Sequence, residues 1–361
     1  MDASSLGLFG ITLLLDARTL ALVGGVLVLL AGATTGVQFL RRRADVAIDS
    51  ALLDTFGRRL RAWWILWAVL AGAFFIGQLA TISLFGFISF WALREFITLT
   101  PTRPGDHRTL FWVFVLCTPV QYVLVGMERY DLFSILIPVY AFLFIPARIA
   151  MSGDAKRFLE RSAKIQAGLL ICVYCLSYAP ALLTLPLKPK EPATASAEDQ
   201  AEAETEAASP RKEPQAPSQA DLEADRKIRG ARLMFFFILM VQLSDALQYA
   251  WAQLPSKHVI VPTINPNRTW EGLLGGTASV MLIGAVLCWA TPFGILTAAG
   301  MSGIVALMGF AGGLTMSAIK RDRGVKDYGT LVEGHGGVLD RIDSLCFAAP
   351  VFFHLTRLYV G

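Results

Sequence analysis

The chain has 361 residues, of which 55% are hydrophobic and 17% are charged, and its mean hydropathy is +0.54. This balance excludes an ordinary soluble domain, because apolar runs of roughly 17–25 residues alternate with charged clusters, and such runs can cross a bilayer as helices. The net charge of +4 is small, and no basic stripe with interleaved aromatic residues occurs, so we expect no nucleic-acid partner.

The N-terminal segment predicts one span that stands apart from the rest. Residues 5–15 are apolar but too short to cross a membrane alone. The first span is predicted at about 20–40, where three consecutive arginines from Arg41 end it. No base precedes Arg18, so the positive segment of a secretory signal is lacking. We therefore expect residues 1–50 to form an additional N-terminal span.

Residues 51–187 predict an N-terminal membrane half. Residues 62–98 are long enough for two spans, with a turn near 78–81, and they close on the polar pair Arg94 and Glu95. Further spans are predicted at about 109–127, 132–148 and 166–187.

Residues 188–230 interrupt the apolar pattern. They are rich in Ala, Glu, Pro, Gln and Ser and lack apolar periodicity, which predicts a disordered linker. Residues 231–361 then form a C-terminal membrane half with spans at about 231–253, 272–292, 294–316 and 344–360. The fold class predicted is an all-α, polytopic integral membrane protein with about ten transmembrane helices.

The distribution of bases predicts the orientation, since cytoplasmic loops carry an excess of Lys and Arg. Ten alternating spans place the base-rich loops on one side, which we assign to the cytoplasm, and the linker on the other. These loops are 41–61, 99–108, 149–165, 254–271 and 317–343.

The loop at 317–343 contains the densest group of chemistry-bearing residues. Asp340 and Asp343 are three positions apart, so on a helix they share a face and could hold Mg²⁺. The bases suited to a polyphosphate, and the glycines that let backbone N–H groups approach phosphate, lie in the same segment. This combination suggests metal-assisted phosphoryl or nucleotidyl transfer. The alternatives are that the bases only signal topology and the Asp pair only caps a helix. The four bases are Lys320, Arg321, Arg323 and Lys326.

A second group lies at 265–272. Asn265 and Arg268 precede a predicted helix start, which makes an anion site, while Thr269 and Glu271 could instead be a cap and a first-turn acid. Upstream, Asp245 lies within an apolar run, where a carboxylate costs roughly 2.5–3.5 kcal/mol unless it faces a cation or a polar cavity. Such a residue is a functional candidate, with a helix–helix hydrogen bond as the alternative.

The loop resembles the signature of the phosphatidate cytidylyltransferases, the CDP-diacylglycerol synthases. Two positions depart from that signature, Val332 and Glu333, where the family has a bulkier apolar residue and Pro or Gly. The segment 265–272 is similar to a second block of the same family, and Asp245 with Tyr249 looks like a third pair, although Gln248 stands where a small residue is usual. The matching signature positions are Ser317, Ile319, Lys320, Arg321, Lys326, Asp327, Gly329, His335, Gly336, Gly337, Val338, Asp340, Arg341, Ile342 and Asp343.

The resemblance implies transfer of CMP from CTP to phosphatidate, with Mg²⁺ as cofactor and a second, monovalent cation left open. It implies membrane lipids as partners, leaves a homodimer open, and places the enzyme in a bacterial inner membrane with the site facing the cytoplasm. Alternatives are another lipid phosphate as acceptor, or a non-catalytic transporter or regulator. The implied catalytic residues are Asp327, Asp340, Asp343, Lys326 and His335; the substrate-binding residues are Ser317, Lys320, Arg321, Arg341, Asn265, Arg268, Thr269 and Glu271; the metal ligands are Asp327, Asp340, Asp343 and Asp245.

Overall fold

The computed structural model describes residues 17–42, 50–99, 102–187, 219–254, 258–329 and 336–360. Over these residues the chain is built from helices, with one short antiparallel hairpin formed by β1 (Val259–Val261) and β2 (Asn265–Thr269). Eight of the helices are long and apolar enough to cross a membrane. The prediction of an all-α, polytopic integral membrane protein is confirmed.

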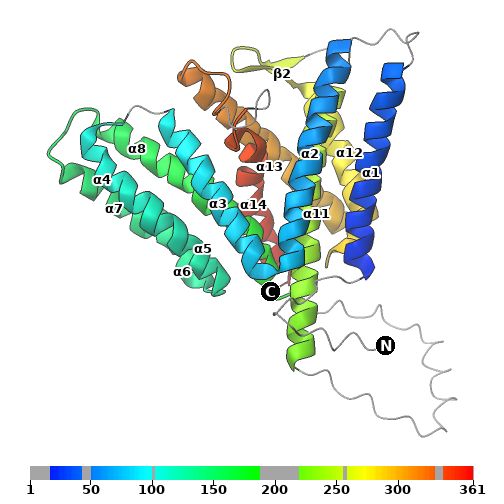
Figure 1. Ribbon diagram of the computed structural model, residues 1–361, viewed down its shortest axis with the longest axis horizontal. Coiled ribbons are helices and arrows are strands. Elements are labelled where there is room, and N and C mark those ends of the chain that lie inside the picture. The colour runs from blue at the N-terminus through cyan, green and yellow to red at the C-terminus, as the bar shows by residue number, and fades with distance from the viewer. Residues whose placement is uncertain are drawn as a thin grey trace, which may run out of the picture.

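The first three helices run up and down across the front of Figure 1, from α1 at the right to α3 near the middle. They are α1 (Ala17–Arg42), α2 (Ser50–Ile76) and α3 (Gln78–Thr98). The chain reverses between α2 and α3 at Gly77, whose φ of 128° is open to glycine but costly for other residues. This confirms two helices in 62–98 and places the turn one residue before the predicted segment.

Three further helical rods complete the N-terminal half, and each contains a π-helical turn. Such a turn interrupts the regular hydrogen-bond ladder without ending the rod. The first rod joins α4 (Pro104–Trp112) to α5 (Thr118–Gly126), the second joins α6 (Tyr130–Ile135) to α7 (Phe142–Ala150), and the third joins α8 (Phe158–Leu169) to α9 (Leu176–Ala181) and a short 3₁₀ turn at Leu182–Thr184.

Four helices form the C-terminal half. They are α11 (Gln219–Trp251), α12 (Trp270–Val286, extended by a 3₁₀ turn at Leu287–Ala290), α13 (Ile295–Asp322) and α14 (Leu339–Val360). Glycines bring them close together: a side-chain carbon at Gly276 would lie 2.8 Å from the Cα of Gln248, and one at Gly312 would lie 2.7 Å from the carbonyl oxygen of Asp343. Small residues at helix contacts are typical of membrane bundles, where packing replaces the hydrophobic effect.

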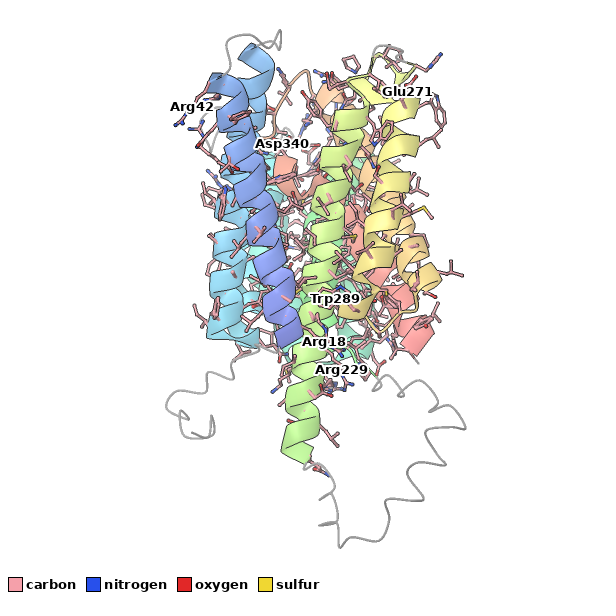
Figure 2. All side chains as sticks on the ribbon, turned by 90° about the vertical axis from the view of Figure 1, so that its right-hand side faces the viewer. Arg18, Arg42, Arg229, Glu271, Trp289 and Asp340 are labelled. Carbon is pink, nitrogen blue, oxygen red and sulfur yellow. The ribbon has the colours of Figure 1, made fainter. Side chains whose placement is uncertain are left out.

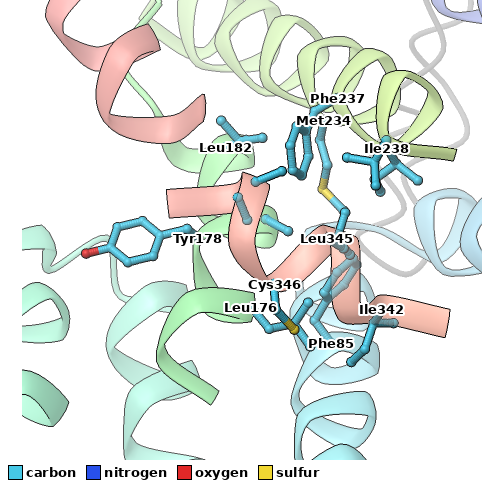
Figure 3. Close-up of a cluster of buried hydrophobic side chains, with 14 of the residues drawn as sticks. Phe85, Leu176, Tyr178, Leu182, Met234, Phe237, Ile238, Ile342, Leu345 and Cys346 are labelled. Atoms are coloured by element: carbon cyan, nitrogen blue, oxygen red, sulfur yellow. The ribbon is translucent and has the colours of Figure 1, made fainter. Parts of the chain in front are cut away.

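The apolar core surrounds α14. Figure 3 shows Leu345 and Cys346 of α14 among side chains from α3, α9 and α11, and both are buried. The helix that begins with Asp340 and Asp343 is therefore held on several sides by packed neighbours. Its start is fixed relative to both halves of the molecule.

Two features differ from the sequence-based outline. The expected count of about ten spans is not confirmed: α2 has an apolar stretch only over 63–76, and α14, which carries several charged residues, is not among the eight apolar helices. The helix α11 begins at Gln219, so 219–230 are helical rather than part of the linker. A charged interaction favours this extension, since Arg226 donates to both carboxylate oxygens of Glu128 at 3.0 and 2.9 Å. Residues 188–218 lie outside the described part.

Candidate active site

The predicted functional loops lie at one end of the bundle. In Figure 2 Arg42, Glu271 and Asp340 lie toward one end, and Arg18 and Arg229 toward the other. The hairpin β1–β2, the last turn of α13 and the first turn of α14 therefore meet at the same end. This agrees with the expectation that loops 254–271 and 317–343 share a face.

Asp340 organises the loop that connects α13 to α14. Its Oδ1 accepts a hydrogen bond from Lys320 Nζ at 2.8 Å. Its Oδ2 accepts from the backbone N–H groups of Tyr328 and Gly337, each at 2.9 Å. Charge-assisted bonds of this kind are stronger than neutral ones. Both oxygens are thus engaged within the protein, so Asp340 holds this loop together. Its role as a metal ligand stays a prediction.

Asp327 approaches the same point from the loop. A side-chain carbon at Gly336 would lie 2.9 Å from Asp340 Oδ2 and 3.5 Å from Asp327 Oδ1. Gly336 has a φ of 77°, in the left-handed region that favours glycine. The two carboxylates therefore flank a backbone position that only glycine fits well, and Asp327 remains exposed to solvent.

Tyr328 anchors this loop in the core. It is 3% exposed, its hydroxyl donates to the carbonyl oxygen of Met316 at 2.9 Å, and its ring stacks on Phe96 of α3 with centroids 6.5 Å apart. Lys320 Nζ lies 5.4 Å from the Tyr328 ring centroid, so the same base contacts both Asp340 and the anchor. Because the side chain of Tyr328 is buried, the preceding residues Lys326 and Asp327 are held at the protein surface, where both are exposed.

Glu95 of α3 is a site residue that the sequence did not identify. Its side chain is 4% exposed, and its two oxygens accept from the N–H groups of Val338 at 3.0 Å and Leu339 at 2.8 Å. These are the first N–H groups of α14, which have no partner within the helix. The glycines Gly329 and Gly337 pack directly against the carboxylate, where any side chain would collide.

A signal for Glu95 did exist in the sequence. It is an acid inside an apolar stretch of α3, and such residues are functional candidates by default. Its partner could not be read from the sequence, because the two positions are 243 residues apart along the chain.

Asp245, Asp343 and Arg268 form a second charged group. Arg268 Nη2 lies 3.7 Å from Asp245 Oδ1, and the space at Gly313 is bounded by Arg268 and by Asp343 Oδ2. Arg268 Nη1 also donates to Gln248 Oε1 at 2.8 Å. Gln248 therefore has a structural role. Its Oε1 holds Arg268 in place, and its Nε2 donates to Ser244 Oγ and to the carbonyl oxygen of Ala306.

The two carboxylates of this group repel each other. Burial, followed by the charge of Asp245, raises the pKa of Asp343 to about 7. Arg268 and Lys320 oppose this shift without cancelling it. A half-buried carboxylate pair with incomplete compensation is a place where a divalent cation would be stabilised.

The four predicted metal ligands do not converge on one point. Among the residues that the structure describes, no group of three or more His, Cys, Asp or Glu side chains could hold a metal ion. Asp340 with Asp327 and Asp343 with Asp245 instead form two pairs. Because Mg²⁺ is commonly held by one or two carboxylates with water and substrate phosphates, the Asp245–Asp343 pair by itself fits this ion.

The hairpin is tied to the end of α13. Asn265 Nδ2 donates to Ser317 Oγ at 3.2 Å, and Arg321 Nε donates to the carbonyl oxygen of Ile264 at 3.2 Å. These bonds bring together Asn265, Ser317 and Arg321, which were predicted to bind substrate. Arg268 of β2 lies against α11 at Gln248 and against α13 at Gly313.

Thr269 and Glu271 have structural partners. Thr269 Oγ1 accepts from the N–H of Gly272 at 3.0 Å and caps α12. Glu271 accepts from the N–H of His258 at 3.1 Å and lies beside its imidazole. The capping alternative for this segment therefore describes its geometry, and the substrate-binding roles of both residues stay predictions.

The remaining predicted residues differ in how much the structure says of them. Lys326 and Arg321 are exposed and Arg341 is half-buried, all at this end of the bundle. His335 lies outside the described residues, as do Val332 and Glu333. The role of His335 stays a prediction.

Comparisons with known proteins give consistent results. The sequence profile described as "Cytidylyltransferase family" matches residues 57–359. The chain is 33% identical over 303 residues to the uncharacterized protein YnbB of Escherichia coli, covering 83% of this chain and 86% of that protein. It is 33% identical over 129 residues to a phosphatidate cytidylyltransferase of Staphylococcus aureus, covering 35% of this chain and 50% of that enzyme. A phosphatidate cytidylyltransferase of Mycobacterium leprae is 37% identical over 133 residues, covering 36% of this chain and 42% of that enzyme.

Proposed function

Since the chain belongs to the cytidylyltransferase family, we propose that it transfers CMP from CTP to phosphatidate, giving CDP-diacylglycerol and pyrophosphate. The observation that carries this proposal is the meeting of two carboxylate pairs with Lys320 and Arg268 at one end of the bundle. Carboxylates for a cation beside bases for phosphate are what nucleotidyl transfer needs. The aligned regions cover about half of the named phosphatidate enzymes, so the acceptor is a proposal too.

In the proposed reaction a phosphate oxygen of the lipid attacks the α-phosphorus of CTP. The bond from that phosphorus to the oxygen bridging to the β-phosphate breaks, and pyrophosphate leaves. The lipid phosphate already has an unprotonated oxygen, so no strong general base is needed. The protein contributes mainly position and charge.

Each part of the site has a separate task in this scheme. Asp245 and Asp343 would hold Mg²⁺, which would offset the charge of the reacting phosphates. Arg268, fixed by Gln248, faces the same space and attracts phosphate oxygens. The exposed bases Lys326 and Arg321 are placed to attract the triphosphate from solution.

Glu95 and Asp340 act indirectly. They hold the start of α14 and the loop before it, and so fix Asp343 relative to Arg268. A preorganised site of this kind needs little rearrangement during the reaction.

The acceptor has an alternative, because the named phosphatidate enzymes align with this chain over 50% or less of their length. That alternative is a cytidylyltransferase that uses another lipid phosphate. A transporter or a non-catalytic regulator on the same scaffold would bind without turnover or move solute without CTP.

The test is a transfer assay on the purified full chain. CTP and Mg²⁺ are supplied with phosphatidate, with an isoprenoid phosphate or with no lipid, and the products are identified by mass. We expect CDP-diacylglycerol and equimolar pyrophosphate from phosphatidate, with loss of both on chelation of the metal. Product only from the isoprenoid phosphate would move the proposal to the second acceptor, and CTP binding without any product would refute enzymatic transfer.

A further inference from the structure

A basic hollow lies between α1 and α2, near the end of the bundle where α1 stops. It is lined by Gln38 and Arg41 of α1 and by Arg61 and Trp64 of α2, among others. Figure 2 places the adjacent Arg42 toward the same end as Asp340. The hollow thus lies near the end of α1 and α2 at which apolar residues give way to charged ones.

Both helices contribute polar and apolar side chains to the lining of the hollow. Trp64 Nε1 donates to Thr34 Oγ1 at 3.2 Å and joins the two helices. A side-chain carbon at Gly57 would lie 3.1 Å from Arg41 Nη2, so the guanidinium extends across α2 at a position without a side chain. Val37 and Leu60 form the apolar part of the lining.

One wall of this hollow lies outside the family match. The match begins at residue 57, whereas α1 covers Ala17–Arg42. Membership of the family therefore assigns nothing to the α1 wall of the hollow, whereas the α2 wall lies within the matched residues. The charged group around Asp343 and Arg268 consists of different residues on different helices, so the two sites can be tested separately.

We propose that the hollow binds the phosphate of an anionic phospholipid from the adjoining leaflet. Two arginines facing one space offer guanidinium donors that match phosphate oxygens, and an indole at the interface suits the glycerol region. Basic pockets between transmembrane helices on the cytoplasmic side are suited to anionic headgroups. Ile65 of α2, which follows Trp64, is exposed and gives an acyl chain an apolar surface close to the hollow.

Two lipids share this chemistry. Phosphatidate presents a phosphomonoester and phosphatidylglycerol a phosphodiester, and the hollow could recognise either through its phosphate. The proposal does not depend on the transfer reaction, because the ligand is recognised by charge and position at residues that the transfer site does not use.

The test is photolabelling in nanodiscs made mostly of phosphatidylcholine, where the surface carries little charge. A small share of the lipid is phosphatidylglycerol or, separately, phosphatidate with a photoreactive group beside the phosphate. Labelled peptides are located by mass spectrometry in the full-length protein. We expect label within 34–64 from at least one of the two lipids. Comparing the amount of label from phosphatidylglycerol with that from phosphatidate shows which headgroup phosphate the hollow binds.

Matched variants make the test specific. Arg41→Gln with Arg61→Gln should reduce labelling within 34–64 by about tenfold or more, since each base near the headgroup contributes on the order of 1 kcal/mol. Arg42→Gln removes the same charge from a neighbouring residue outside the lining and should change labelling less than about threefold. Arg41→Lys with Arg61→Lys keeps the charge and should retain part of the labelling, which also shows that the helices still pack.

Three results would overturn the proposal. Equal loss in Arg42→Gln would mean that only diffuse surface charge attracts the lipid. Unchanged labelling in the protein with Arg41→Gln and Arg61→Gln would show that the lipid does not bind in the hollow. Displacement of the label by soluble glycerol 3-phosphate at the same concentration as the lipid would assign the hollow to a free phosphate instead.

Discussion

At the scale of single residues, the carboxylates of the site differ in what they contact. Asp340 is committed to Lys320 and to two backbone N–H groups. Asp343 instead lies with Asp245 beside Arg268, and its pKa is raised to about 7. Two acids of the same short motif therefore differ in their contacts: Asp340 holds the loop, and Asp343 is the one that we propose binds the cation.

The first prediction separates these roles by their response to magnesium. Asp343→Asn should raise the Mg²⁺ concentration needed for half-maximal transfer and lower the maximal rate by about 100-fold, because a ligand to the ion is lost. Asp340→Asn should lower the rate while leaving the magnesium requirement within about twofold. Mg²⁺ titrations of CMP transfer measure both.

Asp322→Asn is the control, because Asp322 is exposed at the end of α13 and, within the described part of the chain, forms an ion pair only with its neighbour Arg323. If the Asp340 and Asp343 variants shift the magnesium requirement equally, the assignment of separate roles to Asp340 and Asp343 is wrong.

The second prediction concerns Glu95. Glu95→Ala leaves two N–H groups at the start of α14 without their acceptor, which costs about 1–3 kcal/mol for each buried group. We expect a lower melting temperature and a transfer rate reduced by about tenfold or more, since α14 also positions Asp343. Glu95→Gln keeps one acceptor oxygen and should fall between Ala and the unmodified protein.

Arg94→Gln tests whether the effect is specific, because Arg94 is exposed and lies over Trp91 on the same helix. A Glu95→Ala protein with unchanged activity and stability would contradict the positioning role.

At the scale of elements, the boundary between linker and helix has a functional consequence. The helix α11 extends back to Gln219, and its Arg226 pairs with Glu128, which lies in the turn between α5 and α6. Gly230 packs against the backbone of Leu182 and Leu183. The first turns of α11 therefore attach one half of the molecule to the other.

The third prediction follows for deletions. Removing 190–217 should leave transfer activity within about twofold, because this composition lacks the apolar residues that a packed structure requires. Removing 190–228 also removes Arg226 and should lower the melting temperature by several degrees, as loss of a contact between elements would. The test measures the transfer rate and the melting temperature of both deletion variants. An inactive but folded protein lacking 190–217 would contradict the prediction.

At the scale of the whole molecule, the site and the bases that predict orientation lie at the same end. Arg42, Glu271 and Asp340 are together at one end in Figure 2. Because CTP is a cytoplasmic metabolite, the orientation predicted from the bases is also the one that the proposed reaction needs.

The fourth prediction tests this orientation. In a protein whose five cysteines are replaced by alanine, Asp322→Cys at the end of α13 should resist a membrane-impermeant maleimide in intact cells and react after lysis. Asp131→Cys in the first turn of α6, at the opposite end, should react in intact cells. Reversed labelling would place the site outside the cytoplasm and contradict both the orientation and the use of CTP.

The sequence by itself determined the class of protein, and it predicted most of the charged residues that meet at one end of the bundle. Apolar runs of membrane length define helices because an unpaired backbone is too costly in lipid. The spacing of Asp340 and Asp343 put both at one helix start, and the loops containing Arg268 and Lys320 were correctly expected at the same end.

Only the tertiary structure decided how those residues are paired. It joined Lys320 to Asp340 and Arg268 to Asp245, split the expected metal ligands into two pairs, and brought Glu95 to the start of α14. These contacts join helices that are far apart in the chain. Their geometry depends on how glycine-lined helices pack, and no local pattern of residues encodes it.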